Sequence, residues 1–115
     1  MTQIVFIYGG NMERAGLSSE CKNLELIINN LVTGKETCRI EDSGRSLDEV
    51  IEYLCDYLKE LEELDNQISK YGNTKEMLDK VREKYNELWL FQLSFYIDSL
   101  PSVIGGLWSY PETEE

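Results

Sequence analysis

Apolar residues in the first part of the chain follow three short patterns. Residues 3–8 are almost continuously apolar and end at a pair of glycines, which predicts a strand covered on both faces. Residues 18–34 begin with two serines, carry apolar residues at helical spacing and end at Gly34, which predicts a capped helix. Residues 36–41 alternate between apolar and polar side chains, as a second strand does. This order predicts a β-α-β element over residues 1–45 with a parallel strand pair.

The middle of the chain has the pattern of two long amphipathic helices. Ser46, followed three residues later by Glu49, forms a capping box that opens an apolar stripe with spacings of three and four residues. The stripe runs to residue 71, and a Gly-Asn-Thr turn separates it from a second stripe that continues from residue 74 until Pro101. A tight turn between two such helices predicts an antiparallel hairpin over residues 46–100.

The segment after Pro101 carries large apolar side chains before the chain turns acidic. Because two strands alone make a marginal sheet, we expect a third strand from this tail, around residues 103–110, or from another chain. The expected fold is therefore α+β in a single domain over residues 1–115: a small β-α-β element (1–45), a long antiparallel helical hairpin (46–100) and an apolar C-terminal tail (101–115) that can add a strand.

The chain is strongly acidic. The chain has 115 residues, of which 22 are acidic and 11 basic, and its net charge is −11. More than half of this excess lies within residues 46–72, where eight acids and two bases give −6. Such a chain repels phosphate backbones, which disfavours direct nucleic-acid binding. Its field is instead complementary to a basic protein surface.

Acids of the first long helix fall on one side of it. They lie opposite the apolar stripe and three or four residues apart, and we call them the acidic ridge: Glu49, Glu52, Asp56, Glu60 and Glu63. Like charges at this spacing destabilise a helix by a few tenths of a kcal/mol per pair. Solubility requires charge but not a single sign. The ridge is thus either a solvated helix face or a binding surface for a basic partner.

Two pairs of acidic residues have the spacing of a metal-binding signature. Glu49-Val-Ile-Glu52 and Glu76-Met-Leu-Asp79 form an ExxE and an ExxD with 23 residues between them. This resembles the magnesium-binding signature of the all-α NTP pyrophosphohydrolases, the MazG-like family, in which carboxylates on two adjacent helices hold the ions. The resemblance covers residues 46–100 and implies a Mg²⁺-dependent nucleotide hydrolase. Its metal ligands would be Glu49, Glu52, Glu76 and Asp79.

The chain lacks the residues on which other catalytic and metal-binding sites usually depend. The chain has no histidine, the commonest general base and zinc ligand, so we expect no cofactor and no nucleophilic catalysis. The three cysteines, Cys21, Cys38 and Cys55, form no CxxC pair, as expected for reduced thiols in a cytoplasmic protein. Polar residues interrupt the most apolar stretch, residues 88–100, so we expect no membrane span.

Apolar residues near the end of the chain are further candidates for contact with a partner. On a helix continuing to residue 100, Leu90, Leu93 and Ile97 lie opposite the core positions, which predicts burial under the sheet or a homodimer interface. In the tail, Trp108 and Tyr110 are candidate anchors for a partner.

These patterns favour a small acidic inhibitor that occupies a basic, nucleic-acid-binding surface of a partner such as a nuclease. A toxin-immunity protein and a phage anti-defence protein both fit this description. The alternatives are the Mg²⁺-dependent pyrophosphohydrolase and a non-catalytic structural subunit of a larger assembly.

Overall fold

A computed structural model describes residues 16–40 and 45–110 of the chain, and these residues are mostly helical. Within them, four helices follow one another: α1 (Ser18–Thr33), α2 (Leu47–Tyr71), α3 (Lys75–Gln92) and α4 (Leu100–Trp108). Two three-residue strands, β1 (Cys38–Ile40) and β2 (Phe95–Ile97), lie in the α1–α2 and α3–α4 connections. The predicted α+β class is confirmed in this broad sense, with much more helix than sheet.

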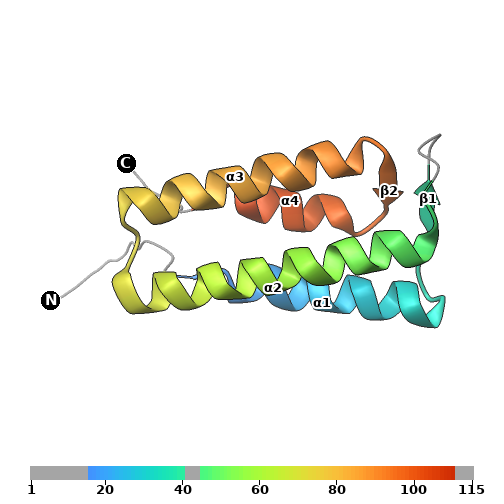
Figure 1. Ribbon diagram of the computed structural model, residues 1–115, viewed down its shortest axis with the longest axis horizontal. Coiled ribbons are helices and arrows are strands. Elements are labelled where there is room, and N and C mark those ends of the chain that lie inside the picture. The colour runs from blue at the N-terminus through green and yellow to red at the C-terminus, as the bar shows by residue number, and fades with distance from the viewer. Residues whose placement is uncertain (1–15, 41–44, 111–115) are drawn as a thin grey trace, which may run out of the picture.

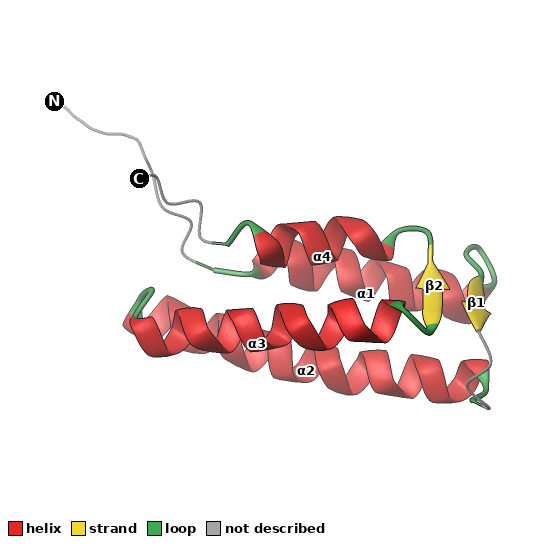
Figure 2. Ribbon diagram, turned by 90° about the horizontal axis from the view of Figure 1, so that it is seen from above, coloured by secondary structure: helices red, strands yellow, loops and turns green. Residues whose placement is uncertain are grey.

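The helices pack side by side in a ring. Helix α1 contacts α2 and α4, and α3 contacts the same two helices from the other side (Figures 1 and 2). Successive helices run in opposite directions, as the colours of Figure 1 show. Because α2 and α4 are both neighbours of α1 and of α3, they lie on a diagonal of the ring. This is the arrangement of an up-down-up-down four-helix bundle.

The two strands form a clip at one end of the bundle (Figure 2). They pair antiparallel, with Cys38 opposite Ile97 and Arg39 opposite Tyr96. The Arg39 guanidinium lies 4.6 Å from the centroid of the Tyr96 ring. The clip therefore ties the α1–α2 connection to the α3–α4 connection. The parallel pair that the sequence predicts involves residues 3–8, which lie outside the described residues.

The second long helix ends earlier than its apolar period predicts. Helix α3 stops at Gln92, and residues 95–97 form β2 instead of the last helical turn. In β2, Phe95 and Ile97 are buried and Tyr96 between them is exposed. A short apolar run fits both periods, and here the partner strand β1 decides the outcome.

The predicted tail strand is wrong, because residues 100–108 form helix α4. Pro101 stands in the first turn of α4, a position where its missing N–H costs nothing, and it does not terminate a helix here. The buried residues of α4 have the spacing of one helical face: Leu100, Val103, Ile104 and Leu107. The tail therefore contributes a fourth helix to the bundle and not a third strand.

Local capping follows the sequence closely at most helix ends. Gly34 ends α1 with a left-handed φ of 80°, and the capping box of Ser46 and Glu49 has both of its hydrogen bonds. Neither serine caps α1, however, whose N-cap is Leu17. The Leu17 backbone N–H instead donates to Oδ1 of Asp65 on α2, at 2.6 Å. A carboxylate from a neighbouring helix therefore satisfies one of the backbone donors left free at the start of α1.

The core lies along the axis of the bundle and draws on every helix. Side chains with no measurable exposure include Leu24 of α1, Leu61 of α2, Leu88 of α3 and Leu100 of α4. Because each helix commits one stripe to this core, the opposite faces carry the polar residues available for binding.

Candidate functional site

The acidic ridge lies on the outer face of α2. All five of its carboxylates are exposed: Glu49, Glu52, Asp56, Glu60 and Glu63. Between them on the inner face, Leu54 and Leu61 are fully buried. The helical wheel therefore places these acids correctly on the side that the core does not use.

Two ridge residues have partners within the protein. Oε1 of Glu49 accepts a hydrogen bond from the Ser46 backbone N–H at 2.9 Å, which closes the capping box. Glu60 forms an ion pair with Lys84 of α3, a lysine whose side chain is only 13% exposed. The Lys84 ammonium also lies 3.3 Å from Oε1 of Glu87. These two acids contribute to the fold as well as to the surface charge.

The other three ridge acids, Glu52, Asp56 and Glu63, form no ion pair with any residue in the described ranges. On α3 the situation is different. Lys75 pairs with Asp79 at 3.4 Å and Lys80 with Glu76 at 3.6 Å, both one turn apart. Exposed pairs of this kind add little stability, but they cancel local charge. Within the described part of the chain, three acids of the ridge are therefore unpaired, whereas Glu76 and Asp79 at the start of α3 are paired.

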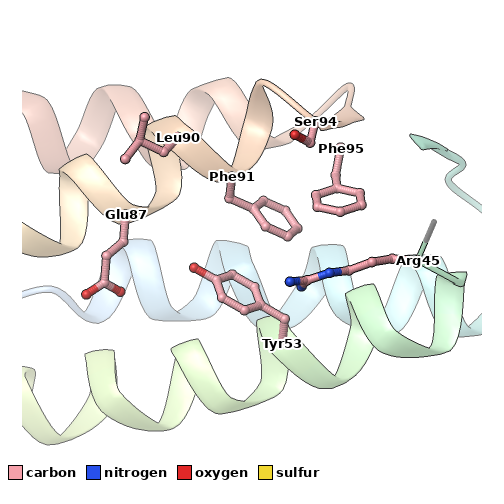
Figure 3. A pocket seen from close by; sticks show the side chains of 7 residues that line it. All are labelled: Arg45, Tyr53, Glu87, Leu90, Phe91, Ser94 and Phe95. Carbon is pink, nitrogen blue, oxygen red and sulfur yellow. The ribbon is translucent and has the colours of Figure 1, made fainter. Parts of the chain in front are cut away.

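Next to the ridge, a groove of about 480 Å³ opens between α2 and α3 near the strand clip (Figure 3). Its floor is aromatic. The rings of Tyr53 and Phe91 are stacked with centroids 4.7 Å apart and planes 7° apart. Phe95 of β2 extends the stack, with its centroid 4.8 Å from that of Phe91. Such contacts fix the ring positions and preform the floor.

Polar and aliphatic groups surround this floor. Arg45, which precedes α2, lies at one side, and Glu87 and Leu90 of α3 lie at the other (Figure 3). Arg45 and Tyr53 also border a second hollow of about 250 Å³, whose remaining lining is Glu49, Glu52 and Asp56. The groove is therefore continuous with the acidic ridge. Sequence patterns missed it because its lining residues come from separate elements of the fold.

Tyrosine hydroxyls near the groove stay protonated. Burial raises the pKa of Tyr53, and the carboxylates of Glu87 and Glu60 raise it further. Burial also raises the pKa of Tyr57, whose hydroxyl donates to the Lys84 carbonyl oxygen at 2.5 Å. Both phenols are thus neutral hydrogen-bonding groups at pH 7.

The two predicted tail anchors have different positions. Trp108 is 61% exposed on α4, with its ring 5.2 Å from that of Tyr85. Because α4 lies diagonally across the bundle from α2, Trp108 is not on the ridge face. Tyr110 is only 5% exposed, its hydroxyl donates to Oδ1 of Asn73 at 2.5 Å, and the hydroxyl oxygen accepts from the Gly16 backbone N–H at 3.1 Å. Tyr110 therefore fastens the fold and offers no surface for a partner.

The structure does not assemble the four-carboxylate metal set. Glu49 and Glu52 stand in the first turns of α2, whereas Glu76 and Asp79 stand in the first turns of the antiparallel helix α3. The pairs are thus at opposite ends of the bundle, roughly 20–30 Å apart at 1.5 Å per residue. Among the described residues, no group of three or more acids or cysteines is arranged to hold a metal ion.

The predicted dimer face is also divided. Leu90 and Leu93 are 60% and 58% exposed at the end of α3. Ile97 is 1% exposed, because it belongs to β2 and points into the core. The far-side assignment of Ile97 is therefore wrong, and Leu90 borders the groove.

Residues 16–40 and 45–110 contain no helix with the length and apolar composition needed to cross a membrane. The three cysteines, predicted to be unpaired, are free thiols in the structure.

Comparison with known proteins adds no relative. No protein-family model, curated protein or solved structure matches this chain. A function can therefore be inferred only from the residues described above.

Proposed function

We propose that this protein is an inhibitor that binds a basic protein through the acidic ridge and covers that partner's nucleic-acid-binding surface. One observation carries the proposal: among the described residues, the ridge presents three acids without an ion pair on one helix face, Glu52, Asp56 and Glu63, whereas Glu76 and Asp79 of α3 are each paired with a lysine. A face that served only solubility would not require charge of one sign.

The partner's chemistry follows from this charge. With a net charge of −11, the protein attracts a basic surface over a distance of about a Debye length, 8–10 Å at physiological salt. Surfaces that bind nucleic acid carry clustered lysine and arginine, so a nuclease or another nucleic-acid-binding effector is the expected partner. Both a toxin-immunity role and a phage anti-defence role in the cytoplasm agree with this binding.

The test is a comparison of two charge-reversed variants with the same net charge. Glu52→Lys with Asp56→Lys changes the ridge, and Glu25→Lys with Glu83→Lys changes exposed positions on α1 and α3. The tagged wild-type and variant proteins are incubated with source-cell lysate at low and high salt, and captured proteins are identified by mass spectrometry. The purified captured protein is then assayed for nucleic-acid binding or cleavage.

The proposal predicts a basic protein that is captured at low salt by the wild type and by the α1/α3 variant but not by the ridge variant. It also predicts that the wild type suppresses the captured protein's action on nucleic acid. Equal capture by both variants, or a captured protein that acts on nucleic acid unimpeded, would contradict it.

The hydrolase alternative has no support in the geometry, because its ligand pairs lie at opposite ends of the bundle.

A further inference from the structure

Two hollows lie along the interface between α2 and α3: one of about 590 Å³ at the α2–α3 turn, with several polar and charged residues in its lining, and the aromatic groove near the strand clip. Towards the α2–α3 turn, polar contacts bridge the helices: Lys80 donates to Oε1 of Gln67 at 3.4 Å, and Lys84 pairs with Glu60. Beyond Lys84, towards the strand clip, the aromatic groove opens between the two helices (Figure 3). Leu90 stands at the edge of this groove, and its side chain is 60% exposed.

The charges around the groove restrict what it can hold. Acids lie on both sides, Glu52 and Asp56 on α2 and Glu87, which is paired with Lys84, on α3. Arg45 is the single base among the described residues that line the groove and the adjoining hollow of about 250 Å³. Phosphates and acidic peptides are repelled by this surround. An apolar group flanked by cations is complementary to it, because its apolar part meets the rings and its charges meet the acids.

We propose that this groove holds apolar side chains from a basic amphipathic helix of the partner, with the flanking lysines or arginines on the acidic ridge. The inference rests on the proposed function and adds the shape of the partner's binding element. An amphipathic helix presents apolar residues three and four positions apart, and such residues are the usual anchors in a groove between helices. The preformed aromatic floor supplies the desolvated centre that charge alone does not provide.

The test uses two synthetic peptides about 18 residues long, each made of the same numbers of leucine and lysine. In one, the leucines share a single helical face; in the other, their order is scrambled so that they do not. Binding to the full chain is measured by isothermal titration calorimetry at low and physiological salt. Leu90→Gln alters the groove, and Leu26→Gln, at a position 58% exposed on α1, is the matched control.

The inference predicts that the amphipathic peptide binds about tenfold more tightly than the scrambled one, the effect of burying one large apolar side chain. Leu90→Gln should remove most of this preference, and Leu26→Gln should leave it intact. Equal affinity of the two peptides, or equal effects of the two variants, would refute binding in the groove without contradicting binding through the acidic ridge. Absence of binding by either peptide at low salt would overturn both.

Discussion

The start of α1 depends on a single carboxylate from another helix. Oδ1 of Asp65 accepts from the Leu17 backbone N–H at 2.6 Å, and α1 has no side-chain cap of its own. A hydrogen bond to an ionised group contributes about 1.5–3 kcal/mol, and loss of an N-cap costs about 0.5–2 kcal/mol. Alanine recovers about 0.5 kcal/mol through its higher helix propensity. Asp65→Ala should therefore lower the free energy of unfolding by about 1–2 kcal/mol.

Urea and thermal unfolding, followed by circular dichroism, measure this loss. At about 5 °C per kcal/mol for a domain of this size, the melting temperature should fall by about 5–10 °C. Asp65→Asn keeps an acceptor oxygen without the charge and should give an intermediate loss. Glu63→Ala, at an exposed position on the same helix, should change stability by less than about 0.5 kcal/mol. If Asp65→Ala is as stable as Glu63→Ala, the cross-helix cap has no energetic role.

Two further properties of the core can be measured independently. A Cβ at Gly106 would lie 2.2 Å from Oε2 of the buried Glu20, whereas one at Gly105 would meet nothing within 4 Å, so Gly106→Ala should lower the melting temperature and Gly105→Ala should raise it slightly. Similar melting temperatures for the two variants would refute this packing. Burial, with smaller effects from nearby carboxylates, raises the pKa of Cys21 from 9.0 to about 12. The folded state therefore disfavours the thiolate, and the resulting stability, complete below pH 9, should be lost as the pH rises from 9 towards 12. Urea unfolding of the wild type and of Cys21→Ala at pH 8 and pH 10.5 should show the steeper fall in the wild type; parallel falls would contradict the shift.

Local signals in the sequence predict the helices that have clear ends. The capping box at Ser46 and Glu49 and the glycine at residue 34 mark real helix boundaries, because each acts through hydrogen bonds within a few residues. Helix α4 and strand β2 depend on distant partners. The apolar run through Phe95 and Ile97 fits a helix until β1 pairs with it, and Pro101 marks a stop or a start equally well.

The candidate site was predictable to the same extent. The exposed side of α2 follows from its own periodicity, so the sequence locates the ridge correctly. Which acids are neutralised does not follow, because the Glu60–Lys84 pair joins residues 24 positions apart. The groove and the burial of Tyr110 likewise arise from contacts between separate helices. Long-range packing, not local pattern, decides these features.

The central claim is that the acidic ridge attracts a basic partner, and the association rate tests it most directly. Surface plasmon resonance with the captured partner should show that Glu52→Lys with Asp56→Lys lowers the association rate constant strongly, while the melting temperature stays near that of the wild type. Glu25→Lys with Glu83→Lys, at the same net charge, should have a much smaller effect, and added salt should reduce the difference between the two variants. Equal association rates for the two variants would contradict the claim and identify the ridge as a solvated helix face.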